Sequence, residues 1–176
     1  GIKKALKKSK IGIINFDAHF DLRPPNKKSN SGTPFHQILN KFNNQVNYLP
    51  VGIQKFSNPE SLYEIASKFK IDYVPIEDCT LNNMKNIFIL VDNFIKESEF
   101  IYLSIDLDGF ASCHAPGVSA PGPFGFSVEF FRILFKYILK TKKVVAIDIV
   151  ELNPLYDIDS ITAKLAALII NMAVTK

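Results

Sequence analysis

Two carboxylates and one imidazole stand two residues apart in the segment 15–21. Asp17, His19 and Asp21 are the three groups, and an apolar run, residues 11–14, comes shortly before them. Such a run is typical of a buried strand in a parallel sheet. Open α/β sheets build their active sites at the carboxyl ends of their strands. The segment therefore predicts a metal site at the end of a strand.

A second apolar run, residues 100–105, leads into Asp106 and Asp108. Residues two apart face the same way along an extended chain, so each segment would present its ligands together if that geometry continued past the strand. Four carboxylates close together would repel one another and raise one another's pKa, and divalent cations remove that penalty. Several carboxylates with one imidazole suit Mn²⁺ best, with Fe²⁺, Co²⁺ or Zn²⁺ as other occupants.

Five ligands are more than one small ion needs if it must also hold a reactive water. They fit a centre of two ions roughly 3.5–4 Å apart, bridged by a carboxylate and by a hydroxide that acts as the nucleophile. Each aspartate alone could be a turn or cap residue, but two such segments, each at the end of an apolar strand, favour metal binding. The expected ligands are Asp17, His19, Asp21, Asp106 and Asp108.

Short apolar strands alternate with helical stretches along the rest of the chain. Strands are predicted over residues 11–16, 47–51, 73–76, 100–105 and 144–150, and helices over residues 34–42, 59–68, 83–97, 128–139 and 161–174. Strands separated by helices predict an α/β fold, with a mainly parallel sheet and helices on both faces. We expect a single domain over residues 1–176. Asn58, Ser127 and Ser160 each precede a predicted helix and are expected to cap it.

Two long irregular loops are predicted, over residues 22–33 and 109–125. Both are rich in proline, glycine or serine, and each directly follows one of the aspartate-bearing segments. Loops of this size inside a compact domain are usually functional. We therefore expect both loops to border the metal site.

The composition is that of an ordinary globular protein, with 47% hydrophobic residues, 22% charged residues and a net charge of +4. No apolar run reaches the roughly 18 residues needed to cross a membrane. Cys79 and Cys113 lie far apart, so a reducing cytoplasm and two buried thiols are expected. The lysines gather in residues 3–10 and 136–143 without interleaved aromatic residues, which favours a solvated surface over a nucleic-acid-binding one.

The chain begins with glycine, and its first eight residues are typical of the end of a helix. We expect it to be a piece of a longer protein whose upstream part is missing. Two motifs and one further carboxylate resemble the ureohydrolases, the arginase–agmatinase–formimidoylglutamase superfamily. Segment 17–21 is similar to that family's second metal motif, and segment 104–108 to its third. Glu151, within segment 148–154, is similar to its substrate-binding glutamate.

The resemblance implies a three-layer αβα fold, truncated at its amino-terminal end, and a binuclear manganese centre. This centre would hydrolyse a C–N bond at an amidine or guanidine carbon. Asp17 and Asp106 would bridge both ions. His19 and Asp108 would complete one ion. Asp21 would bind the other ion and take a proton from the bridging water.

Further residues are expected to meet the substrate. Glu151 could pair with a cationic amidine and hold it in place. The guanidinium of Arg23 could bind a substrate carboxylate bidentately, and Ser31 could supply a hydroxyl donor. His36 follows the first long loop, where arginases carry a proton-shuttle histidine. Its spacing differs, so both a shuttle role and a place in the first turn of a helix are open.

Within the superfamily, segments 16–23, 31–35 and 114–121 resemble the formimidoylglutamase branch. That likeness implies N-formimidoyl-L-glutamate as substrate, with L-glutamate and formamide as products, in histidine degradation. Arginase-type or agmatinase-type guanidine hydrolysis is the alternative, as is a non-catalytic homologue. The family's first metal motif, which ends in a histidine, is not in these residues, so their activity on their own is open. The resemblance allows a homo-oligomer, and no nucleic acid or membrane partner is expected.

Overall fold

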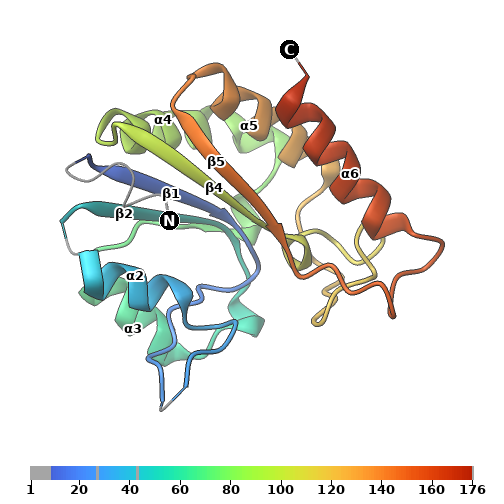
Figure 1. Cartoon of the computed structure of the whole chain (residues 1–176), viewed down its shortest axis with the longest axis horizontal. Helices are drawn as coiled ribbons and strands as arrows, with labels where there is room; N and C mark the ends of the chain where they lie inside the picture. Colours follow the sequence, from blue (N-terminus) through green and yellow to red (C-terminus); the bar gives the residue numbers. More distant parts are fainter. Residues whose placement is uncertain (1–8, 27, 43, 176) are drawn as a thin grey trace.

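The computed structural model describes residues 9–26, 28–42 and 44–175. Five parallel strands form one sheet in the order β3-β2-β1-β4-β5 (Figure 1). The strands are β1 (Ile11–Phe16), β2 (Val46–Ile53), β3 (Val74–Pro75), β4 (Phe100–Asp106) and β5 (Val144–Val150). The α-helices are α2 (Pro34–Phe42), α3 (Glu60–Lys68), α4 (Met84–Lys96), α5 (Val128–Lys140) and α6 (Ile161–Val174). Short 3₁₀ turns are η1 (Lys55–Ser57), η2 (Ile76–Asp78), η3 (Leu81–Asn83) and η4 (Leu107–Gly109).

The helices cover both faces of the sheet, which gives the three αβα layers that the resemblance implied (Figure 1). Ile13 and Tyr48 face one side, where they pack with α2 and α3. Their neighbours Ile14 and Leu49 face the other side, towards α4, α5 and α6. This alternation follows from the two-residue period of a strand. The predicted α/β fold with a parallel sheet is confirmed.

Most predicted elements lie where the apolar pattern placed them. β1, β5, α2 and α6 match their predicted ranges residue for residue. β2 is longer than predicted, because it lies between two strands and stays extended up to Ile53. β3 is shorter than predicted, because the 3₁₀ turn η2 begins directly after Pro75.

The predicted N-cap residues of α5 and α6 differ in outcome. Ser127 caps α5 as predicted, since its hydroxyl accepts a hydrogen bond of 3.1 Å from the amide of Phe130. The prediction for Ser160 is wrong: its backbone is left-handed, with φ 57°, and its side chain caps nothing. Asp157 takes that role, because its carboxylate accepts hydrogen bonds from two amides in the first turn of α6.

The sheet is fully covered in its middle and open at β5. Every residue of β1 is buried, whereas no residue of β5 is. A groove of about 960 Å³ runs along β5 between α5 and α6 and is lined mainly by apolar side chains. No helix of the described residues is long and apolar enough to cross a membrane. Cys79 is buried as predicted, but Cys113 is exposed, because it lies in the long loop after β4.

Candidate metal centre

β1 and β4 are neighbours in the middle of the sheet, and this pairing builds the centre. Phe16 lies opposite Ile105 in the parallel register. The next residues, Asp17 and Asp106, therefore stand side by side at the carboxyl ends of the two strands. Both side chains are nearly inaccessible, at 1% and 7% exposure. Segments far apart in the sequence thus deliver two carboxylates to one place.

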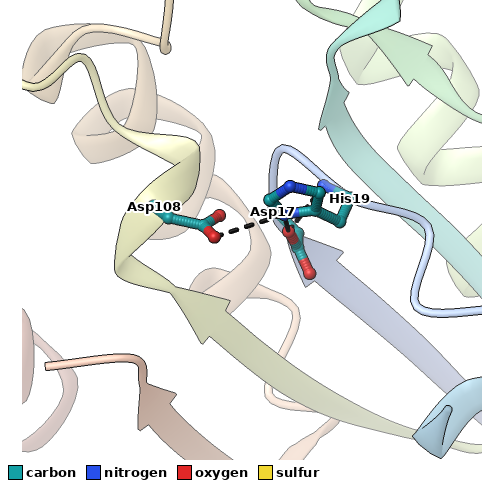
Figure 2. Close-up of side chains that lie close together, drawn as sticks. All are labelled: Asp17, His19 and Asp108. Carbon is teal, nitrogen blue, oxygen red and sulfur yellow. Dashed lines mark hydrogen bonds and ion pairs between the residues drawn. The ribbon is translucent and has the colours of Figure 1, made fainter. Parts of the chain in front are cut away.

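Asp17, His19 and Asp108 form a compact group whose ligand atoms all lie within 4.8 Å of one another. Figure 2 shows the imidazole of His19 between the two carboxylates. Its Nδ1 atom lies 3.4 Å from Oδ1 of Asp17 and 3.2 Å from Oδ2 of Asp108. These three are predicted ligands, and the fold brings them together.

The other predicted ligands border the same hollow, a cavity of about 240 Å³ at the carboxyl edge of the sheet. The predicted residues that line it are His19, Asp21, Arg23, Ser31, Asp106, Asp108 and Glu151. Both long loops contribute to its wall, the first through Ser31 and the second through Ser119. The expectation that these loops border the site therefore agrees with the structure.

The local geometry of the ligands differs from the predicted extended one. The chain bends directly after Asp17, and the carboxylate of Asp17 accepts a hydrogen bond of 2.6 Å from the amide of His19. The same turn recurs after β4, where Asp106 accepts one of 2.9 Å from the amide of Asp108. Aspartates often close such local turns. Asp21 has a left-handed backbone, with φ 51°. Two matching turns, rather than extended chain, therefore aim the ligands.

Burial and mutual repulsion dominate the electrostatics of the centre. Burial raises the pKa of Asp106 to about 10, and the nearby charges of Asp17 and Asp108 add to the rise. Burial likewise raises the pKa of Asp21 to about 8. Hydrogen bonds to Asp108 and Asp17 raise the pKa of His19 to about 10. The carboxylates favour positive charge in their midst, and an imidazolium at His19 supplies one such charge.

The donor set fits a divalent cation. Oδ1 of Asp108 is buried and has no hydrogen-bond partner among the described residues. A buried carboxylate oxygen without a partner is costly, and a cation would satisfy it. Carboxylate oxygens with a single imidazole suit Mn²⁺ and related hard or borderline ions.

A buried network behind the ligands was not predicted. The side-chain Nδ2 of Asn15 lies 2.9 Å from Oδ2 of Asp17 and 3.1 Å from the hydroxyl of Tyr48, and it donates to both. The hydroxyl of Tyr48 in turn donates to the carbonyl oxygen of Phe20, at 3.0 Å. One signal was present in the sequence, because Asn15 is a polar residue inside a predicted apolar strand. The structure buries it, at 1% exposure.

Glu151 reaches the cavity from the end of β5, as its position in the sequence suggested. It has a left-handed backbone, with φ 65°, which is uncommon for a residue with a side chain. The hydroxyl of Ser119 donates a hydrogen bond to its carboxylate. Ser119 was not predicted as a site residue, since only the pairing of the second loop with β5 reveals its role.

Arg23 and Ser31 lie together at the rim of the cavity. The amide of Arg23 donates to the carbonyl of Gly32 at 2.9 Å, and this bond ties the ends of the first loop together. The Arg23 side chain passes close to Gly32, where a Cβ atom would lie only 3.1 Å from its Cδ. The absence of a side chain at position 32 thus leaves room for the guanidinium.

His36 is the predicted site residue that the fold does not bring to the cavity. It lies in the first turn of α2, one of the two places that the sequence left open. Its ring stands edge-on to Phe69, with 5.8 Å between the ring centres, and lies within hydrogen-bonding distance of Asn40. His36 is not among the residues that line the cavity.

Comparison with known proteins identifies the family. The model of the arginase family matches residues 1–175. The chain belongs to the arginase family. It is 46% identical over 166 residues to a formimidoylglutamase of Legionella pneumophila (strain Lens), covering 92% of this chain and 52% of that protein. It is 39% identical over 168 residues to a formimidoylglutamase of Geobacillus sp. (strain WCH70), covering 95% and 51%.

Solved structures agree with this family and fold. A formimidoylglutamase from Bacillus subtilis subsp. subtilis str. 168 superposes with a TM-score of 0.88 at 28% identity, over 96% of this chain and 54% of that one. An arginase from Bacillus caldovelox has a TM-score of 0.83 at 19% identity, over 95% and 61%, which shows the shared fold alone. This arginase-family chain spans about half the length of the curated relatives it matches.

Proposed function

We propose that this chain carries the metal site of a ureohydrolase that hydrolyses the C–N bond of a linear amidine, with N-formimidoyl-L-glutamate as substrate. One observation carries the proposal: the carboxylates at the ends of β1 and β4, an imidazole and Glu151 meet at one cavity. The substrate rests on the likeness to formimidoylglutamases at 46% and 39% identity. This activity would belong to histidine degradation.

In the proposed site, Asp17, His19, Asp21, Asp106 and Asp108 would hold two manganese ions. When bound, such ions make water a strong nucleophile near neutral pH. Asp21 lines the cavity, and its carboxylate, kept ionised by bound cations, could take a proton from the attacking water and pass it on. This proton goes to the nitrogen that leaves with glutamate.

The reaction then balances simply. The oxygen of water adds to the formimidoyl carbon, the bond from that carbon to the glutamate nitrogen breaks, and formamide and L-glutamate separate. Glu151 faces the cavity with one carboxylate oxygen fixed by Ser119. Its negative charge pairs with the cationic amidine and orients the amidine carbon. Ser119 therefore positions the Glu151 carboxylate that would bind the amidine.

The two carboxylates of the substrate need cationic and polar partners away from the acidic centre. Arg23 and Ser31 lie at the rim of the same cavity, and a guanidinium binds a carboxylate in a bidentate manner. We assign His36 no part in the reaction, because its ring packs against Phe69 outside the cavity.

The test is release of formamide and L-glutamate from N-formimidoyl-L-glutamate by the manganese-loaded chain. An Asp108→Asn variant should abolish it, whereas Asp72→Asn, which makes the same change at an exposed residue, should not. A second variant, Gly32→Ala, should displace the Arg23 side chain and weaken its hydrogen bond to the substrate carboxylate. We expect KM to rise about tenfold, the effect of losing one hydrogen bond to a charged group, with little change in kcat.

Other outcomes would redirect the proposal. Urea released from agmatine or arginine, without formamide from N-formimidoyl-L-glutamate, would keep the chemistry and replace the substrate. Bound manganese without turnover of any of these three compounds would favour a non-catalytic homologue. Failure of the chain to bind manganese at all would contradict the metal centre.

A further inference from the structure

Asn58 touches the segment that carries His19, although it lies far from that segment in the sequence. We call residues 17–21 the ligand loop. The side chain of Asn58 is 6% exposed. Its Oδ1 accepts a hydrogen bond from the amide of Phe20 at 3.0 Å, and its Nδ2 donates to the carbonyl of Ala18 at 2.8 Å. The two bonds hold the backbone on either side of His19.

The hydrogen-bonding capacity of Asn58 is directed at the backbone. Its second N–H donates to the carbonyl of Gln54, also at 2.8 Å, so both donors of the carboxamide are used. Asn58 borders the cavity but has no donor left for a substrate. Its place before Pro59 predicted that Asn58 caps α3. This prediction is wrong, because no side-chain hydrogen bond caps that helix. These contacts therefore indicate that Asn58 positions the backbone of the ligand loop.

The ligand loop is held from a second side by Tyr48, whose hydroxyl donates to the carbonyl of Phe20 at 3.0 Å. Asn58 and Tyr48 therefore bind the amide and the carbonyl of the same residue. The amide of Gln54 adds a fourth hydrogen bond to the loop, to the carbonyl of Ala18, at 3.0 Å. With its flanking peptides held this way, His19 is kept with its imidazole between the two carboxylates of Figure 2.

We propose that Asn58 is a positioning residue: it fixes the ligand loop and thereby sets the affinity of the centre for its metal. The inference rests on the proposed function, since it takes His19 as a ligand. Groups that orient metal ligands typically change metal affinity 10–100-fold when they are removed. Asn58 acts one step further back, through the backbone rather than through the imidazole.

An Asn58→Asp variant separates positioning from a mere effect of charge. Aspartate has nearly the same shape, but it places a carboxylate oxygen against the carbonyls of Ala18 and Gln54, where Asn58 places its N–H groups. Residue 58 would lose two hydrogen bonds, one of them to the ligand loop, and gain repulsion. The added negative charge near the cavity would by itself attract a divalent cation more strongly. The two effects on metal affinity therefore have opposite signs.

Manganese affinity is measured by titration with electron paramagnetic resonance detection of free Mn²⁺. We expect Asn58→Asp and Asn58→Ala each to weaken binding about tenfold or more. Asn86→Asp, which makes the same charge change on the exposed surface of α4, should leave the affinity unchanged. Unchanged or tighter binding in Asn58→Asp would overturn the proposal.

A second measurement needs no metal. Hydrogen exchange of the metal-free chain, followed by NMR, reports the Phe20 amide that Asn58 binds. In Asn58→Ala this amide should exchange about fivefold faster or more, the effect of losing one hydrogen bond, while amides of Ile13 and Ile14 inside β1 keep their rates and show that the variant folds. An unchanged rate at Phe20 would overturn the proposal even if manganese affinity fell.

The two readouts separate this inference from the proposed function. If the unaltered chain binds no manganese but Phe20 exchanges faster in Asn58→Ala, the proposed metal centre fails and the positioning of the loop is supported. If the unaltered chain binds manganese and Asn58 variants bind it equally well, the metal centre stands and the role of Asn58 fails.

Discussion

The two hollows of this chain, one at the carboxyl edge of the sheet and one along β5, are opposite in chemistry. The cavity at the ends of β1 and β4 measures about 240 Å³ and is lined by carboxylates, an imidazole and a guanidinium. The groove along β5 is larger, about 960 Å³, and is lined mainly by apolar side chains and lysines. Size alone would select the groove. The buried titratable groups gathered in the cavity, rather than its size, are the reason that we place the proposed functional site there.

The helices beside the two regions show the same contrast. α5 buries one apolar side, including Phe131 and Phe135, against the sheet. α6 is apolar around most of its circumference, and Leu168, Ile170 and Val174 remain 62%, 55% and 74% exposed. In the cavity, polar groups are costly because they are buried. Along α6, apolar groups are costly because they are hydrated.

The largest expected effect is at the cavity, from Asp106→Asn. We expect this variant to bind no Mn²⁺ at concentrations that saturate the unaltered chain, since it removes a carboxylate between β1 and β4. Without metal it should be more stable, by about 0.5–2 kcal/mol, because an asparagine at this buried position needs neither a charge nor the uptake of a proton. Metal titration and urea unfolding of the metal-free chain measure the two effects. A less stable variant would mean that the cavity is not under strain.

Phe131→Ala tests the covered side of the sheet. The ring is fully buried and packs against Phe16, with ring centres 4.9 Å apart. Its loss should cost about 3–5 kcal/mol in the free energy of unfolding, through lost burial and the void that remains. Urea unfolding by circular dichroism measures the loss. A cost below about 1 kcal/mol would show that this core is loosely packed.

Leu168→Lys is the matched change on the open side. Because the side chain is 62% exposed, the free energy of unfolding should change by no more than about 0.5 kcal/mol. The dye 8-anilinonaphthalene-1-sulfonate should bind the exposed apolar surface of α6 in the unaltered chain and bind Leu168→Lys less. Equal fluorescence in both proteins would mean that Leu168 does not contribute to a dye-binding surface, and a large loss of stability would mean that the Leu168 side chain is packed against the fold.

The smallest expected effect lies at the start of α6. Desolvation alone would raise the pKa of Asp157, but hydrogen bonds from the amides of Thr162 and Ala163 outweigh it and lower the pKa below its ordinary value. A carboxyl with a lowered folded pKa stabilises the fold above its unfolded pKa, and this contribution disappears as the pH falls through the folded pKa.

The unaltered chain should therefore be more stable than Asp157→Asn at pH 7, and the difference should shrink as the pH falls below about 4, the ordinary range of an aspartate. Urea unfolding at several pH values measures it. Asn153→Asp, a change of charge in the same connecting segment, serves as the control. A difference that does not depend on pH would show that the charge of Asp157 plays no part.

The sequence by itself determined the elements and the kinds of ligand. Apolar periodicity is a local property, and it was sufficient for β1, β5, α2 and α6 to be predicted residue for residue. The sequence also places carboxylates directly after two apolar strands. Such carboxylates lie at the carboxyl edge of any parallel sheet, so the kind of site could be predicted.

Only the tertiary structure decided which of these groups meet. β1 and β4 are neighbours in the sheet although β2, β3 and three α-helices lie between them in the chain, and no local pattern contains that information. The roles of Asn58 and Ser119 depend on contacts across the fold, so Asn58 read as a helix cap in the sequence and holds the ligand loop in the structure. His36 lies outside the cavity, because in α2 its ring packs against Phe69. Residue types and local spacing therefore indicate the candidate site residues, and contacts between distant segments of the chain decide which of them lie together.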